Sequence, residues 1–194
     1  MAYTIRMRFA LARHTATDWD EEKPSRLKGQ QDRPLSERGK GEAESLADIL
    51  KKTSAGLQRV VSSDLLRAVE TAQILSGKLQ LPLSTDERLR ECSFGALEGL
   101  TREQIIGQFG TNILQHLDDN WRAYDFRSVG GEHRDAVLKR MIILLQQVSI
   151  EHPREDVLLV GHSRAMDTLL DGLGQRPGLH HNEVRFVEFP QIDG

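Results

Sequence analysis

The chain has 194 residues, of which 38% are hydrophobic and 28% are charged, and its net charge is -3. This length suits one domain, expected over residues 1–194, and the small net charge gives no general attraction to nucleic acid or to a membrane surface. No apolar run reaches the roughly 20 residues that cross a bilayer, the one cysteine, Cys92, cannot form an internal disulfide, and no secretory signal is recognised, so we expect a cytoplasmic protein.

Patterns typical of strands and helices alternate along the first half of the chain. Residues 5–11 place apolar side chains at every second position with arginines between them, which predicts a strand with one face less buried than the other. Residues 36–52 predict a helix with one apolar stripe, and residues 59–61 predict a second strand. Residues 62–79 predict a helix that begins at a Ser-Ser-Asp sequence and carries Arg67 in its first turn.

The second half continues the alternation. Apolar positions between 137 and 148 predict a long helix, which ends at His152-Pro153 because the residue before a proline disfavours helical geometry. Residues 157–160 are apolar throughout, as expected of a central strand covered on both faces, and residues 184–189 predict a last strand. The alternation favours the α/β class, as a three-layer α/β/α sandwich with a mostly parallel central sheet.

Two histidines stand at the ends of predicted strands. Arg13-His14 follows the first strand, and His162 follows the apolar strand 157–160. Side chains just past the carboxyl ends of strands in an open α/β sheet converge on one crevice. We therefore expect both histidines to face a single bound group, with a histidine as the nucleophile of an enzyme.

A phosphoryl group is the ligand that these residue types suit. Its oxygens need positive charge, and Arg13 and Arg67 offer planar sets of donors that engage two oxygens at once. Neutral His14 could attack phosphorus through a ring nitrogen, and His162, if protonated, would donate to the same oxygens. The leaving oxygen needs a proton, for which Glu91, in the sequence Leu-Arg-Glu-Cys-Ser-Phe-Gly, is the candidate.

Five motifs carry a resemblance to a known family. They are Arg13-His14-Thr15, residues 29–39 (GQQDRPLSERG), 62–72 (SSDLLRAVETA), 89–101 (LRECSFGALEGLT) and 160–163 (VGHS). In this order the chain resembles the histidine phosphatase superfamily, which includes phosphoglycerate mutases and broad phosphomonoesterases. The resemblance implies a phosphoglycerate mutase-like fold.

The resemblance also implies roles for individual residues. His14 would be the phosphorylated nucleophile and Glu91 the proton donor, while the phosphate pocket would be formed by Arg13, Arg67 and His162, with Ser163 beside it. It implies a small phosphorylated substrate and no metal or other cofactor. The segment between Thr101 and Gly130-Gly131-Glu132 is short, as in the phosphatase branches, which favours hydrolysis over mutase chemistry.

Several positions depart from the family pattern. Thr15 replaces a glycine, and it would be strained if the backbone there had a positive φ. Asp20 and Lys28 stand where asparagine and glutamine are common, and we hypothesise that they form an ion pair, because Asp20 alone would repel a phosphate dianion. His133 and Arg164 add potential cations to the rim of the site and suggest an anionic leaving group.

Rival chemistries fit the chain less well. The sequence from Gly161 to Ala165 imitates the nucleophile elbow of a serine hydrolase, but too little chain follows it to supply the acid and the histidine. A cysteine phosphatase would need an arginine at position 98, which is Glu98, and a zinc site built on the two histidines and Glu91 would be opposed by neighbouring arginines.

The sequence therefore predicts a metal-independent phosphomonoester hydrolase that forms a phosphohistidine on His14. Two alternatives stay open. One is a catalytically weakened relative that binds phosphorylated ligands or proteins, suggested by Thr15 and Asp20. The other is a mutase-type phosphotransferase. The natural substrate and the oligomeric state are not predicted.

Overall fold

The computed structural model describes residues 6–53, 56–119 and 121–190. In this part of the chain, one five-stranded sheet has the order β3-β2-β4-β1-β5. Neighbouring strands are parallel except β5, which pairs antiparallel with β1 at one edge. The strands are β1 (Arg6–Arg13), β2 (Leu57–Ser62), β3 (Leu83–Thr85), β4 (Asp156–Gly161) and β5 (Val184–Pro190).

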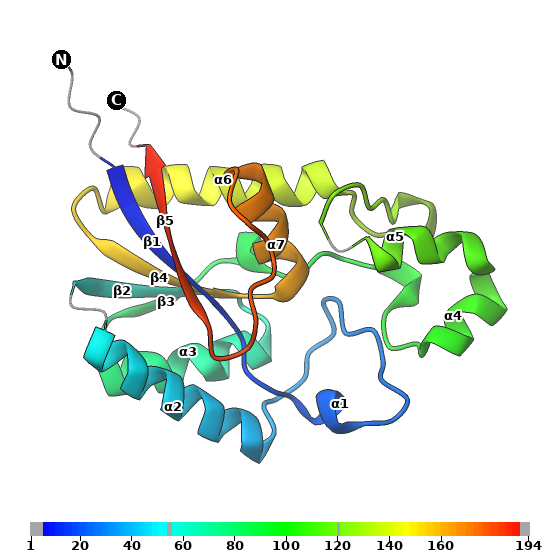
Figure 1. The fold of residues 1–194 in the computed structure, drawn as a ribbon, viewed down its shortest axis with the longest axis horizontal. Coiled ribbons are helices and arrows are strands. Elements are labelled where there is room, and N and C mark those ends of the chain that lie inside the picture. The colour runs from blue at the N-terminus through cyan, green and yellow to red at the C-terminus, as the bar shows by residue number, and fades with distance from the viewer. Residues whose placement is uncertain (1–5, 54–55, 120, 191–194) are drawn as a thin grey trace.

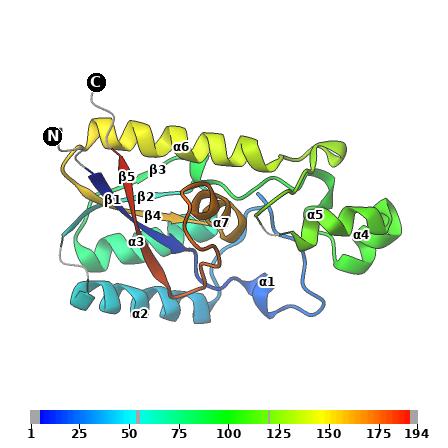
Figure 2. The same cartoon turned by 45° about the horizontal axis from the view of Figure 1, so that its top comes forward.

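Helices cover both faces of the sheet, as Figure 2 shows, with α6 and α7 on one face and α2 and α3 on the other. The short helices α4 and α5 lie to one side of the sheet (Figure 1). The helices are α1 (Asp18–Glu21), α2 (Glu37–Thr53), α3 (Leu66–Leu79), α4 (Arg102–Phe109), α5 (Leu114–Asp118), α6 (Arg134–Glu151) and α7 (Ser163–Gly172). The predicted three-layer α/β/α sandwich is confirmed, and no described helix has the length and apolar character of a membrane span.

The core explains why the strand patterns differ. On β1, Phe9 and Leu11 pack against α6 and α7, while Ala10 and Ala12 pack against α2 and α3. All four side chains are fully buried. The prediction of one less buried face was therefore wrong for the carboxyl half of β1, because small alanines let α2 and α3 approach there. The apolar β4 is the middle strand, as predicted.

The start of α3 differs from its predicted position. Ser62 is the last residue of β2, a turn over Ser63, Asp64 and Leu65 follows it, and the helix begins at Leu66. The turn is held because the backbone N–H of Ser63 donates to the Val160 carbonyl (2.9 Å), which continues the pairing of β2 with β4. Asp32, from a distant loop, accepts from the Leu66 N–H (2.6 Å) at the helix start. A long-range contact thus sets this boundary.

The carboxyl ends of β1, β2 and β4 meet at one edge of the sheet. The His14 N–H donates to the Gly161 carbonyl (2.9 Å), so the residues that follow β1 and β4 stay side by side. Ser63 follows β2 at the same level, through its own bond to β4. The backbone therefore brings His14, Ser63 and His162 together although the sequence separates them widely.

Candidate active site

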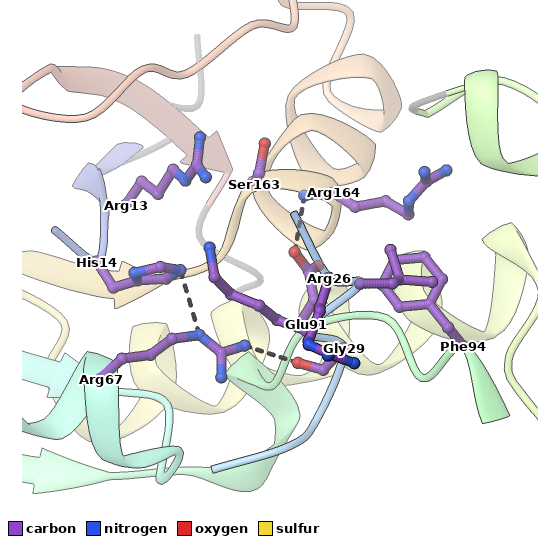
Figure 3. A pocket seen from close by; sticks show the side chains of 11 residues that line it. Arg13, His14, Arg26, Gly29, Arg67, Glu91, Phe94, Ser163 and Arg164 are labelled. Atoms are coloured by element: carbon purple, nitrogen blue, oxygen red, sulfur yellow. Dashed lines mark hydrogen bonds between the residues drawn. The ribbon is translucent and has the colours of Figure 1, made fainter. Parts of the chain in front are cut away.

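His14 is held in one tautomer. Its side chain is only 3% exposed, and its Nδ1 lies 2.7 Å from the Thr15 carbonyl oxygen, which can only accept, so Nδ1 carries the hydrogen. The other ring nitrogen, Nε2, accepts a hydrogen bond from Arg67 Nε at 3.2 Å (Figure 3). Both contacts leave the lone pair on Nε2, which is the form that a nucleophilic imidazole requires.

The surroundings of His14 keep it neutral. Burial lowers its pKa well below the ordinary range, and the nearby His162, Arg67 and Arg13 lower it further, because each disfavours a second positive charge. The ring centroids of His14 and His162 are 5.2 Å apart. Burial and the two arginines therefore keep the nucleophile unprotonated, and the same arginines attract an anion.

His162 is fully buried beside His14. Its Nε2 is 2.9 Å from Ser63 Oγ, and its Nδ1 has no hydrogen-bond partner among the described residues. Burial and the charge of Arg67 lower its pKa well below the ordinary range, so the structure does not favour the protonated form considered from the sequence. A neutral His162 that accepts from Ser63 still has one N–H to donate, from Nδ1.

The two arginines differ in how they are held. Arg67 is 1% exposed and donates to the carbonyl oxygens of Gly29 (2.6 Å) and Gln31 (2.8 Å), so it ties the loop before α2 to the site. Arg13 lies across the site (Figure 3), and its buried Nε has no partner among the described residues. Burial lowers the pKa of both guanidinium groups, although both remain charged at neutral pH.

The side chain of Glu91, from the loop after β3, lies against the amino end of α7. Its Oε1 accepts from the backbone N–H groups of Cys92 and Ala165, both at 2.9 Å, and its Oε2 accepts from that of Arg164 at 3.2 Å. Its own carbonyl accepts from the side chains of Gln30 (3.0 Å) and Arg140 (3.1 Å). The carboxyl group is thus fixed in orientation. Oε2 is the less strongly bound oxygen, because it accepts one long hydrogen bond whereas Oε1 accepts two shorter ones.

Most of these side chains surround one pocket of about 210 Å³, while His162 lies beside His14 and outside its lining. The residues expected from the sequence that line it are Arg13, His14, Lys28, Arg67, Glu91, Ser163 and Arg164, whereas Asp20 is not part of the lining. Arg26, Leu27, Gly29 and Phe94 line it as well and were not predicted. Arg26 and Leu27 belong to a loop without periodicity, so sequence patterns gave no signal for them. Among the described residues, no three His, Cys, Asp or Glu side chains are grouped to hold a metal ion.

Asp20 and Lys28 form an ion pair at the pocket, as hypothesised, and their part in phosphate binding stays a prediction. Asp20 also accepts from the Thr17 backbone N–H (2.8 Å) and Oγ1 (2.9 Å). Burial would raise the pKa of Asp20, but the hydrogen bond from Lys28, the bonds from Thr17 and the Lys28 charge outweigh burial and lower it from 3.8 to about 2. The aspartate is therefore neutralised by its neighbour rather than left to repel an anion.

The Asp20 pKa predicts a pH dependence of stability. Because the folded-state pKa lies below the unfolded value, the pair stabilises the fold fully above the unfolded pKa and loses this contribution as the pH falls through about 2. We expect the difference in unfolding free energy between wild type and Asp20→Asn, about 2 kcal/mol at pH 7, to shrink towards zero between about pH 4 and 2. Urea unfolding at each pH measures it. A difference that stays constant down to pH 2 would contradict the pairing energy, and Lys28→Gln should show a weaker pH dependence than wild type.

Thr15 is not strained. Among the described residues, only Gln80 and Asn182 combine a side chain with a positive φ, so the concern raised by the replaced glycine does not apply. Thr15 is fully buried, and its backbone N–H donates to Thr71 Oγ1 of α3 (3.2 Å). Its own hydroxyl lies 3.3 Å from the same oxygen. The threonine thus fastens the loop after β1 to α3.

The two rim cations expected from the sequence serve other purposes. His133 caps α6, where its Nδ1 accepts from the Asp135 N–H (3.1 Å). The Arg164 guanidinium points away from His14 (Figure 3) and donates to backbone carbonyls at the end of α5, including that of Leu117 (2.9 Å). It also packs over the rings of Phe94, Tyr124 and Phe126. Arg164 still lines the pocket, although its guanidinium is engaged by these carbonyl groups, and the suggestion that both residues mark an anionic leaving group stays a prediction.

Comparison with known proteins agrees with this site. A model of the histidine phosphatase superfamily (branch 1) matches residues 9–186. This chain belongs to that superfamily. The match begins in β1 and ends in β5, so it includes His14, Arg67, Glu91 and His162.

Relatives in the superfamily carry phosphatase and mutase names. Glucosyl-3-phosphoglycerate phosphatase of Mycobacterium tuberculosis is 33% identical over 88% of this chain and 76% of its own length. Probable phosphoglycerate mutase GpmB of Proteus mirabilis is 32% identical over 90% of this chain and 78% of its own. Among solved structures, YhfR of Bacillus stearothermophilus is 30% identical with a TM-score of 0.78, covering 97% of this chain and 92% of that chain. These matches support a phosphatase of the histidine phosphatase superfamily.

Proposed function

We propose that this protein is a metal-independent phosphomonoester hydrolase that works through a phosphohistidine on His14. The observation that carries the proposal is the fixed tautomer of His14, whose unprotonated Nε2 lies against the Arg67 guanidinium in a pocket shared with Glu91. The lone pair, the cationic surroundings and the carboxyl group are the three requirements of phosphoryl transfer to an imidazole.

In the first half-reaction, His14 Nε2 bonds to phosphorus and the bond to the leaving oxygen breaks. Arg13, Arg67 and the His162 N–H stabilise the charge on the phosphoryl oxygens. Glu91 delivers a proton to the leaving oxygen, so an alcohol departs rather than an alkoxide. Arg67 must turn its Nε–H from His14 to a phosphoryl oxygen, which frees the lone pair as the substrate binds.

In the second half-reaction, water attacks the phosphohistidine. The Glu91 carboxylate accepts a proton from that water, the bond between Nε2 and phosphorus breaks, and inorganic phosphate and neutral His14 result. A group that donates a proton in one step and accepts one in the next returns to its starting state. The proposed cycle uses no metal ion and no organic cofactor.

The leaving group would lie against Arg26, Leu27 and Phe94, on the side of the pocket next to Glu91. We propose a small phosphorylated substrate, because the pocket of about 210 Å³ holds a phosphoryl group and a modest leaving group. The features that suggested a binding-only relative, Thr15 and Asp20, are explained by the Thr71 contact and the Lys28 ion pair. We place the protein in the cytoplasm, as expected from the sequence.

A Glu91→Gln variant tests the function through the leaving group. We expect the variant to lose about 10²- to 10⁴-fold in kcat for an alkyl phosphate, whose poor leaving group needs a proton, and much less for a nitrophenyl phosphate, which leaves as a stable anion. Steady-state release of inorganic phosphate from both substrates gives the comparison. Equal losses on the two substrates would contradict a proton-donor role, and transfer of phosphate to a second hydroxyl instead of to water would favour the mutase alternative.

A further inference from the structure

Three buried side-chain atoms lack a hydrogen-bond partner in the part of the chain that the structure describes: Arg13 Nε, His162 Nδ1 and His181 Nε2. The first two belong to residues already assigned to the phosphate. Buried polar atoms are nearly always paired, and an exception calls for a specific explanation. Two of them belong to rings beside His14, since the His181 ring centroid is 5.8 Å and the His162 ring centroid 5.2 Å from that of His14, and the third belongs to the residue that directly precedes His14.

His181 reaches this place from outside the five motifs. It lies in the connection between α7 and β5, which runs past the end of β1 in Figures 1 and 2. Asp167 of α7 holds this connection by accepting from the backbone N–H groups of Gly178 (2.7 Å) and Leu179 (2.9 Å). Asn182, with a φ of 60°, turns the chain directly after His181. The turn is therefore built to present the histidine at a defined position.

The orientation of the ring indicates which edge is used. The residue as a whole is half-buried, yet its Nε2 is closed off from solvent, so the edge that carries Nε2 is directed inward. The charged groups that act on it are Arg13, Asp20, Lys28 and Arg38. Burial, with the charge of Arg13, lowers its pKa to about 4, so a neutral ring with one N–H lies beside His14 at neutral pH.

We propose that His181 is a further phosphate-binding residue of this active site, which donates from Nε2–H to a phosphoryl oxygen alongside Arg13 and His162. The inference rests on the proposed function, because it assigns the same pocket to a phosphoryl group. A bound phosphoryl oxygen would supply the acceptor that Nε2 lacks. The opposing explanation is that the ring only packs against His14.

Two variants separate these explanations. His181→Phe keeps a flat ring and removes both nitrogens, whereas His181→Gln gives up the ring and keeps an N–H donor near the position of Nε2. His180→Phe, at the exposed neighbouring histidine, is the matched control. Binding of inorganic phosphate is measured by calorimetry, and kcat and KM are measured with an aryl phosphate. Urea unfolding establishes that each variant is folded, and His181→Ala replaces the phenylalanine variant if that one is not.

We expect His181→Phe to bind inorganic phosphate about 10- to 100-fold more weakly than wild type, with a matching rise in KM, because it loses a hydrogen bond to a charged group. His181→Gln should recover most of the affinity, and His180→Phe should match wild type. Any result in which the glutamine variant binds phosphate no more tightly than the phenylalanine variant overturns the proposal. A wild type that neither binds phosphate nor hydrolyses the ester would instead refute the proposed function itself.

Discussion

Replacing His14 with asparagine should reduce hydrolysis of an aryl phosphate by at least about 10⁴-fold, because no other side chain can take over a covalent step. Asparagine keeps a polar group that can donate to the Thr15 carbonyl, so the surrounding loop is preserved. Binding of inorganic phosphate should persist, since the cationic side chains that hold it are unchanged. Turnover and calorimetric phosphate binding, measured on the same preparation, give the two results.

The control for this variant is His180→Asn, an exposed histidine in the same chain. It should keep wild-type turnover. A His14→Asn protein that retains more than about a hundredth of the wild-type rate would show that water attacks the ester directly, with His14 only as a hydrogen-bonding group.

Replacing Arg67 with methionine is expected to lower both activity and stability. Methionine fills a similar volume without the charge, so the change removes the donor to phosphate and the bonds to Gly29 and Gln31. We expect kcat/KM to fall by about 10²- to 10³-fold, as for loss of one charge-stabilising donor. The unfolding free energy should fall by about 2 kcal/mol, because two carbonyl oxygens lose their partner.

Two further variants are compared with Arg67→Met: Arg67→Lys, which keeps the charge, and Arg59→Met, which is the control. Lysine restores the charge but cannot reach several acceptors at once, so it should recover only part of the activity. Arg59, on β2, pairs with Glu155 away from the pocket (2.8 Å), and its replacement should leave kcat/KM unchanged. If Arg67→Met reduced stability but not kcat/KM, Arg67 would be a structural anchor alone. Assays of an aryl phosphate and urea unfolding distinguish the two.

The convergence of His14 and His162 could be predicted because it depends on the backbone. Both residues follow strands of a parallel sheet, and strand ends meet at one edge whatever the side chains are. The Asp20–Lys28 pair was equally predictable, since a carboxylate at a phosphate site needs a nearby cation. Both predictions need only the order of the strands along the chain and the charges of the side chains.

Other features depend on long-range contacts that leave no local pattern. The direction of Arg164 is set by aromatic rings between positions 94 and 126, and the start of α3 is set by Asp32. Thr15 is accommodated without strain because its φ is not positive, and this backbone angle cannot be predicted from the sequence. His181 belongs to an irregular connection, so nothing periodic pointed to it before the fold placed its ring beside His14.

The covalent phosphohistidine on His14 can be trapped by stopping the reaction rapidly without acid. The protein is mixed with an aryl phosphate carrying radioactive phosphorus, stopped with alkaline denaturant within the first turnover, and digested for peptide mapping. We expect label that survives alkali, is released by acid, and lies on the peptide that contains His14. Rapid turnover without labelled protein, or label on a peptide that lacks His14, would contradict the covalent step.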